Sequence, residues 1–278
     1  MLQRVCNEVG LPEPTLVLSS TDRQMRQLLA ITYRVGNDLR ACAWPDMQKE
    51  YSFTLVNGQD AYPFPADYDF DISETHWNRS TTNSLIGPLS PSEWQSLKSG
   101  SITSSITNYQ FRFKGSGTNQ FFIDPTPTAT NAGEILVFEY QSLNWIRPRT
   151  WTASTNFAAG SFCFNNGNLF RTVAGGTSGA SAPTPALLND GGVTWIVVSV
   201  YSAFSADTDE FLIDEELVGL GVQWNYLASK GLPYAHLEAK YKIDKQVAQA
   251  KAQGGETLSM VPGWSLYGSG YRNYRIVP

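Results

Sequence analysis

The chain has 278 residues, of which 42% are hydrophobic and 16% charged, and its formal net charge is −5. This length allows one large domain or two ordinary ones, and the negative net charge excludes a global basic field that would attract nucleic acid. Charged residues are scarcer than the roughly 25% of an average globular protein. A polar, weakly charged surface of this kind is typical of β-rich extracellular or virion proteins.

The three cysteines, Cys6, Cys42 and Cys163, are an odd number without metal-ligand spacing. We therefore expect small buried thiols rather than disulfides or a metal site. Residues 1–10 mix charged with apolar side chains, so no signal peptide is predicted. No apolar run approaches the ~20 residues of a membrane span. The sequence predicts a soluble protein that is made in a cytoplasm.

Two helices are predicted near the N-terminus. Residues 1–10 form a short helix closed by Gly10, and residues 21–43 form a longer one, capped by Ser20 or Thr21. Apolar residues of the longer helix recur with the period of one buried face. We expect that face to contain Met25, Leu28, Leu29, Thr32, Val35, Leu39 and Cys42.

Two further helices are predicted near the C-terminus, at residues 207–230 and 233–253, the first capped by Thr208 or Asp209. The first carries an apolar stripe at intervals of four and three residues, which predicts a buried face. Its members are Ile213, Leu217, Leu220, Trp224 and Leu227. The apolar side of this helix pair must be buried against another helix, and residues 21–43 are the convincing candidate. Residues 1–48 and 202–254 are therefore expected to form one helical layer.

The intervening residues 49–145 are predicted to form an antiparallel β-domain. Strands are expected at 50–56, 60–64, 71–79, 109–114, 120–123 and 134–140, with a short helix opened by Ser90. Asn57-Gly58 predicts a hairpin turn between the first two strands, and residues 65–72 are expected to form a loop. The predicted fold class is α+β: a helical layer formed by both chain ends, with an antiparallel β-barrel or sandwich insertion and a second small β-module.

The chemistry of an enzyme is missing from the sequence. Only two histidines occur, His76 and His236, and no phosphate-binding, nucleophile-elbow or zinc-protease motif is present. Asp67, Asp69 and Asp71 alternate in the predicted loop, but the glycine and distal glutamate of a calcium loop are absent. We expect no catalytic residue, metal or cofactor. A hydrolase of cell-wall glycans is a weaker alternative, because no acid pair can be identified.

Residues 146–201 differ in composition, with small residues at 174–185 and strands expected at 161–164, 169–173 and 193–198. The motif order WTAST, LFRT, AGGTSG and DGGVTW resembles the chitin-type carbohydrate-binding module. This resemblance implies that Trp151, Phe170 and Trp195 are the candidates for stacking on sugar rings. The competing interpretation is that so small a unit needs its tryptophans for its own core.

Residues 255–278 have no periodicity but are rich in aromatic and basic side chains. These residue types dominate binding hot spots, which is typical of a segment that becomes ordered on a partner. The candidate docking residues are Trp264, Tyr267, Tyr271, Arg272, Tyr274 and Arg275.

The outer frame, residues 1–145 and 202–278, also resembles a known family. The segments Ala66-Asp67-Tyr68, Trp77-Asn78-Arg79, FRF, IDPTP and FEY occur in order between the terminal helices. Together they resemble the head-to-tail adaptor of short-tailed phages, the tail tubular protein A type. The resemblance implies a virion protein at the head–tail junction, made in the host cytoplasm. Twelve copies would form a ring beneath the portal, with the tail nozzle as a second partner and the C-terminal tail docked on the portal.

Two functions stay open at this stage. The first is the ring-forming adaptor, whose acidic chain would let DNA pass without sequence-specific binding. The lysines 240, 242, 245 and 251 could line such a channel locally, although ordinary solvated helix surface is the favoured explanation of them. The alternative function is a glycan-binding tail or receptor-recognition subunit that uses the inserted module on host glycan.

Overall fold

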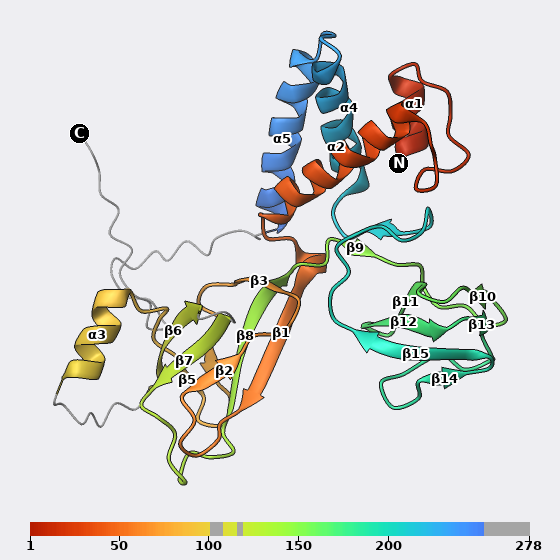
Figure 1. Cartoon of the computed structure of the whole chain (residues 1–278). Coiled ribbons are helices and arrows are strands. Elements are labelled where there is room, and N and C mark those ends of the chain that lie inside the picture. The colour runs from red at the N-terminus through yellow and green to blue at the C-terminus, as the bar shows by residue number, and fades with distance from the viewer. Residues whose placement is uncertain (101–107, 116–118, 253–278) are drawn as a thin grey trace, which may run out of the picture.

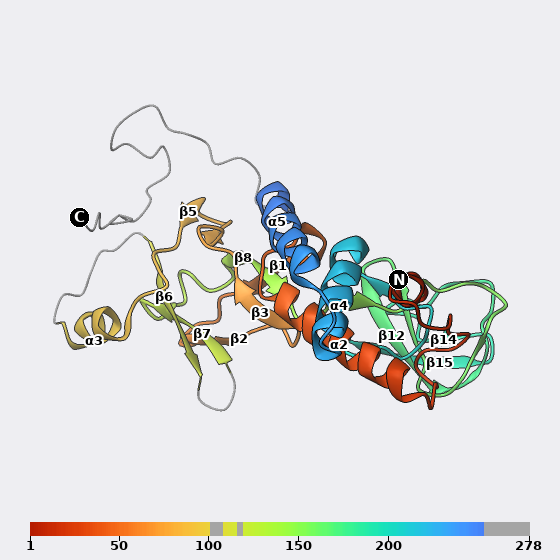
Figure 2. The same cartoon turned by 90° about the horizontal axis from the view of Figure 1, so that it is seen from above.

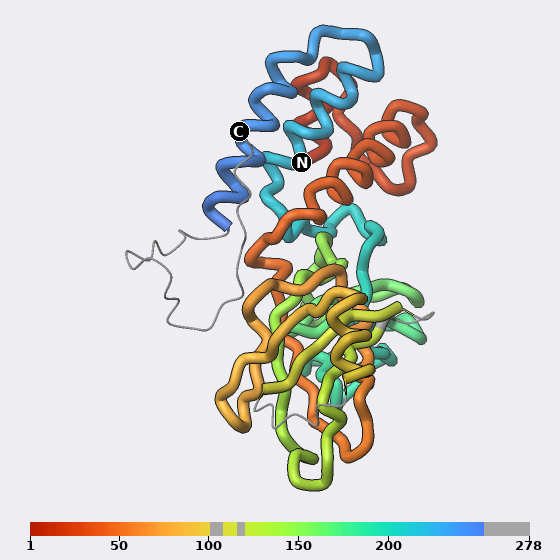
Figure 3. Tube along the Cα trace, turned by 90° about the vertical axis from the view of Figure 1, so that its left-hand side faces the viewer, coloured from red at the N-terminus to blue at the C-terminus, as the bar shows by residue number. Residues whose placement is uncertain are grey.

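The computed structural model describes residues 1–100, 108–115 and 119–252. A layer of helices lies at one end of the molecule, and two β-rich parts lie side by side at the other end (Figure 1). The view from the side shows the same division (Figure 3). Both chain ends contribute to the helical layer. The α+β class predicted from the sequence is confirmed.

The helical layer consists of α1 (Leu2–Glu8), α2 (Arg23–Arg40), α4 (Glu215–Ser229) and α5 (Ala235–Ala252). Helix α4 is central, because it contacts the other three. The predicted cap of α2 at Ser20 or Thr21 is wrong by one or two residues. Asp22 is the cap, and its carboxylate accepts the N–H of Gln24 at 3.0 Å.

The predicted start of α4 is also wrong. Its cap is Asp214, whose carboxylate accepts the N–H of Glu216 at 2.9 Å. The preceding residues include a short strand, β16 (Glu210–Phe211), paired with β9 (Ile146–Arg147). Asp209 closes a turn instead, because its carboxylate accepts the N–H groups of Ser205 and Ala206 at 2.7 and 3.0 Å.

The α2 face predicted to be buried is largely confirmed. Its positions Met25, Leu28, Val35 and Leu39 are buried, whereas Leu29 is half-exposed. On α4 the buried face is shifted from the predicted stripe. Leu217 is buried, as is Ile213 just before the helix, but Leu220, Trp224 and Leu227 are only partly buried. The most buried residues of α4 lie beside the stripe instead: Val218, Val222 and Tyr226.

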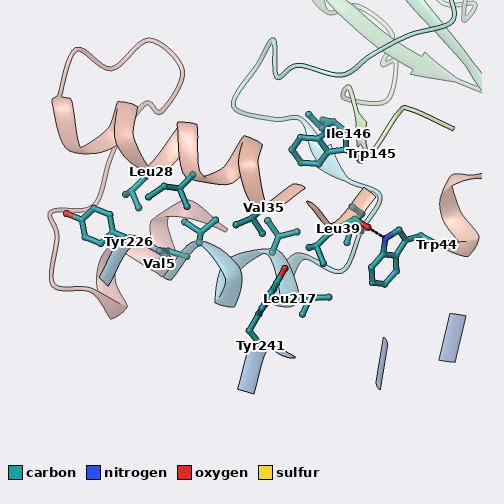
Figure 4. Close-up of a cluster of buried hydrophobic side chains, with 14 of the residues drawn as sticks. Val5, Leu28, Val35, Leu39, Trp44, Trp145, Ile146, Leu217, Tyr226 and Tyr241 are labelled. Atoms are coloured by element: carbon teal, nitrogen blue, oxygen red, sulfur yellow. Dashed lines mark hydrogen bonds between the residues drawn. The ribbon is translucent and has the colours of Figure 1, made fainter. Parts of the chain in front are cut away.

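Trp145 lies at the centre of the contact between the helical layer and the rest of the chain (Figure 4). Its ring is fully buried and lies so close to α2 that a Cβ added at Gly36 would be 2.2 Å from it. Tyr33 and Phe204 pack edge-on against it, with ring centroids 6.3 and 5.6 Å away. Trp44 joins the same core and donates its indole N–H to the carbonyl of Leu39 at 2.7 Å. The sequence analysis did not assign Trp145 to the core.

The β-domain contains two sheets. The first has the order β1 (Gln48–Thr54), β8 (Ile135–Ser142), β4 (Trp77–Asn78), β5 (Asn83–Ser84), with β3 (Tyr68–Asp71) also paired to β8. The second has the order β2 (Ala61–Pro63), β7 (Asn119–Asp124), β6 (Gln110–Gly115). Helix α3 (Pro91–Ser99) begins at the expected Ser90, which forms a capping box with Glu93, and a 3₁₀ turn (Pro45–Met47) precedes β1. None of the sheets in the described residues closes into a barrel, so that alternative is wrong.

Two local predictions for this domain are also wrong. Asn57-Gly58 does not close a hairpin, because β1 pairs with β8 and β2 pairs with β7 in the other sheet. The expected loop at 65–72 contains the strand β3. Both errors have one cause. The two sheets share an aromatic core of residues distant in sequence, including Phe111, Phe121 and Phe138, and this packing decides the pairing.

The second β-rich part spans the predicted module. Its main sheet has the order β11 (Phe162–Asn165), β12 (Asn168–Ala174), β15 (Val193–Val198), β14 (Asn189–Asp190), beside the pair β10 (Asn156–Phe157) and β13 (Gly176–Thr177). The side chain of Asn144 joins the two ends of this segment. Its amide donates to the carbonyl of Ser199 at 2.7 Å, and its oxygen accepts the N–H of Tyr201 at 2.6 Å.

Candidate assembly site

The predicted docking tail cannot be placed in the fold. All six of its candidate residues lie within 253–278, outside the described residues. They are Trp264, Tyr267, Tyr271, Arg272, Tyr274 and Arg275. The described chain ends at Ala252, at the C-terminus of α5, so the tail begins at that end of the helical layer.

The three predicted sugar-stacking residues have different environments. Phe170 and Trp195 are 0% and 1% exposed and form the core of the module with Phe157. Neither offers a ring face to a sugar, so the prediction is wrong for these two, because the small module uses them as its own core. Trp151 is half-exposed, but its indole N–H donates to Asp190 at 2.9 Å, which ties it to the module.

The alternating carboxylates 67, 69 and 71 do not converge on a common site. Asp67 is buried and accepts hydrogen bonds from Lys49, Tyr140 and Ser142 at 2.7, 2.9 and 2.8 Å. Burial opposes its ionisation, but Lys49 and the two hydroxyls outweigh burial and lower its pKa.

The other two carboxylates face different groups. Asp69 lies 3.0 Å from Nε of Arg40, at the end of α2, which links the β-domain to the helical layer. Asp71 lies 3.8 Å from Nε2 of His76. In the described part of the chain no group of three or more potential ligands is placed to hold a metal ion.

His76 is buried among aromatic rings of the β-domain. It stacks on Phe111 and Phe138, with ring centroids 4.3 and 5.3 Å away, and its Nε2 has no hydrogen-bond partner. Desolvation lowers the pKa of His76 to about 4, while burial raises the pKa of Asp71. At neutral pH His76 is therefore an uncharged ring in the core of the β-domain.

Acidification is expected to destabilise this domain. The unfolded chain takes up a proton on His76 near its ordinary pKa of 6.5, whereas the folded chain resists protonation down to about 4. Stability is therefore present above pH 6.5 and is lost as the pH falls, by about 2 kcal/mol between pH 6.5 and 5. The raised pKa of Asp71 acts in the opposite direction. Denaturant unfolding at pH 6.5 and 5 measures the free energy of unfolding of wild type and His76→Phe. We expect the loss of stability at the lower pH in wild type alone. An equal loss in both proteins would contradict this prediction.

Helix α5 has one apolar face against α4 and another with no partner among the described residues. Tyr241 is its one buried residue, whereas Ile243 and Val247 are 59% and 47% exposed. At about 100° per residue, the exposed Ala239, Ile243 and Ala250 lie roughly opposite Tyr241. Leu232 and Tyr234, also exposed, extend this apolar surface at the N-terminus of the helix. These exposed residues are called the α5 outer face below.

The opposite edge of the layer carries an apolar groove of about 190 Å³. Its apolar lining comprises Leu2, Pro14, Val17, Leu18, Leu29, Phe204 and Phe211. The loop after α1 is fixed there, because the N–H groups of Val17 and Leu18 both donate to Asp207, at 3.1 and 2.9 Å. Leu29, predicted to be core, is half-exposed because it belongs to this groove. These lining residues are called the α1-edge groove below.

The two edges differ in charge. Helix α5 carries four lysines against two carboxylates, Glu238 and Asp244, one of them paired with Lys242 at 2.6 Å. Residues 206–216, which include part of the lining of the α1-edge groove, contain six carboxylates and no basic residue. Only Asp207 and Asp209 of these six line the groove, whereas Asp214 and Glu216 line a separate pocket with Lys240 and Lys251 of α5. Glu210, Glu215 and Glu216 pair with Arg147, the N-terminal ammonium of Met1 and Arg4. The α1-edge groove is therefore apolar with two carboxylates in its lining, and the α5 outer face is apolar with lysines beside it.

The cysteines have the structural environments expected of them. Cys6 and Cys163 are buried, which raises the pKa of both thiols, and Cys42 is half-buried at the end of α2. All three are free thiols. Among the described residues, no helix combines the length and hydropathy needed to cross a bilayer.

Apolar surface at both edges of the helical layer is typical of proteins that assemble with other proteins. The comparison with protein families specifies the class. The family model described as SU10 adaptor protein matches residues 1–259, so the chain belongs to this family of phage adaptors. No curated protein matches the chain. As an adaptor, it is a structural protein of the virion at the head–tail junction, with portal and tail proteins as its partners.

Proposed function

We propose that several copies of this chain form a ring between the portal and the tail nozzle, through which DNA passes during ejection. The observation that carries this proposal is the helical layer, which exposes apolar residues at two edges in the described part of a chain of the adaptor family. When one edge of each copy binds the other, different edge of the next copy, a closed ring forms if the successive rotations add up to a full turn. The tail tubular protein A type, with twelve copies, is the specific arrangement that we propose.

Each part of the chain has its own role in this proposal. The helical layer makes the ring, the β-domain faces the tail nozzle, and residues 255–278 dock on the portal. DNA passes without sequence-specific binding, because a chain of net charge −5 makes few of the phosphate contacts that retain a duplex. The chain is made in the host cytoplasm and acts without catalysis or cofactor.

The glycan-binding alternative has less support. Two of its three stacking residues are core residues of the module, and the third, Trp151, is held by Asp190. The module is joined to the helical layer, since Leu169 and Tyr201 are part of the same buried cluster as Trp145. We propose that the carbohydrate-binding-like module is a structural insertion on the body of the adaptor.

Portal binding is the direct test of this function. We expect the protein to co-elute with purified portal protein as a complex containing many copies, and to elute as a much smaller species alone. Static light scattering across the peaks measures both masses, and chitin oligosaccharide added to the isolated protein checks the alternative. A protein that ignores the portal but binds the glycan would show that the adaptor proposal is wrong.

A further inference from the structure

We infer that the α5 outer face of one copy packs into the α1-edge groove of the next copy, so that these two surfaces form the repeated contact of the ring. This inference rests on the proposed ring. It specifies which two surfaces are in contact, and it assigns a second copy of this chain as the partner of the α5 outer face.

The first support is the position of the two surfaces. Viewed from the front, α5 and α1 lie at opposite edges of the helical layer with α4 between them (Figure 1). The view from above shows α5 and the N-terminus again on opposite sides of α4 (Figure 2). Surfaces at opposite edges cannot meet within one copy. They can meet between successive copies, and this geometry makes a heterologous contact.

The second support is the shape and polarity of the α5 outer face. Helix α5 exposes Ile243 roughly opposite the buried Tyr241, and Ala239 and Ala250 beside it are small enough to admit a close partner. Val247, also exposed, lies at the border of this face. A helix buried on one side alone would have polar residues there. The α1-edge groove offers the apolar counterpart, with Leu29 and Phe211 in its lining.

The third support is charge. Lys240 is exposed beside the α5 outer face, while Asp207 and Asp209 line the α1-edge groove. Opposite charges at the two surfaces favour the contact between unlike edges. They disfavour contacts between two α5 faces, where like charges meet.

The area that α5 can bury determines whether this contact is stable without the portal. A helix of 18 residues is about 27 Å long and about 10 Å wide, so its face covers roughly 270 Å². A stable interface needs about 800 Å² on each partner. The helix contact alone is therefore too small, and we expect it to form when the portal holds neighbouring copies side by side.

Cysteine cross-linking on the portal tests the contact. One variant carries Ile243→Cys and the other carries Leu29→Cys, both with Cys42→Ser, because Cys42 is the half-exposed native thiol. The two are mixed in equal amounts with portal protein and treated with a short bis-maleimide. We expect covalent dimers from the mixture, and none from either variant alone. Val173→Cys, 58% exposed against 59% for Ile243, replaces Ile243→Cys as the matched control and should give none.

The other outcomes separate the two proposals. Covalent dimers from Ile243→Cys alone would show that α5 faces meet each other, and our pairing would be wrong. Co-elution with the portal without any cross-link would show that another segment or the portal covers α5, which also overturns it. Failure of the unsubstituted protein to bind the portal would overturn the proposed function itself, and with it this contact.

Discussion

Gly36→Ala is expected to lower the free energy of unfolding by about 2 kcal/mol, although alanine is the better helix former. The added Cβ would lie 2.2, 2.3 and 2.6 Å from three carbons of Trp145. Trp145 is fully buried between α2 and the rings of Tyr33 and Phe204. Its ring therefore cannot move aside to make room for the added Cβ. Overpacking of a filled core costs about 1 to 3 kcal/mol, which exceeds the gain of about 1 kcal/mol in helix propensity.

Gly219→Ala in α4 is the matched control. Its added Cβ would meet nothing nearer than the Cγ of Met1 at 3.6 Å, an ordinary contact, so it should be neutral or stabilising. Trp145→Ala should itself cost about 3 to 5 kcal/mol, and in that background Gly36→Ala should no longer destabilise. Urea unfolding followed by circular dichroism gives all four values. If Gly36→Ala matched Gly219→Ala, the placement of Trp145 against α2 would be wrong.

Removal of residues 255–278 is expected to weaken portal binding at least 100-fold while leaving the described fold intact. The described core ends before this segment, so the free energy of unfolding should not change. Loss of several aromatic and arginine anchors should cost about 2 kcal/mol each in binding. Biolayer interferometry on immobilised portal measures the dissociation constant.

Substitutions inside the tail sharpen this prediction. Trp264→Ala together with Arg272→Ala should reproduce much of the loss, whereas Ser265→Ala together with Ser269→Ala should not. Unchanged portal affinity after deletion of the whole segment would remove the docking role from the tail and leave it without an assigned function.

The helical layer could be predicted from the sequence because its signals are local. Apolar periodicity and the glycine or proline after each helix identify all four helices, although the start of α4 was placed eight residues too early. The apolar faces of the two C-terminal helices required a helix from the other chain end to bury them. The buried face of α4 could not be predicted in detail. A helix between several neighbours is buried on more than one side, so Val218 and Val222 compete with the predicted stripe.

The β-domain shows where local signals fail. Asn57-Gly58 is a strong hairpin turn, yet β1 and β2 belong to different sheets because Phe53 and Tyr62 must both reach one aromatic core. The burial of Phe170 and Trp195 follows the same rule, since a short module has few other residues for its core. The family resemblance led to the adaptor function, and the family match supports it.

The candidate site was only partly visible in the sequence. The exposed apolar positions of α5 can be read from its spacing, because Ala239, Ile243 and Ala250 recur at helical intervals opposite Tyr241. The α1-edge groove has no such signal. Its walls come from α1, the following loop, α2 and residues 204–211, which are brought together by hydrogen bonds such as those from Val17 and Leu18 to Asp207.

Single-particle electron microscopy of the protein mixed with its portal tests the central claim most directly. We predict a ring that forms on the portal, with twelve copies, the helical layers in lateral contact and the central channel open. The same protein imaged alone should show no such ring. A discrete trimer or monomer that is identical with and without the portal would contradict the account.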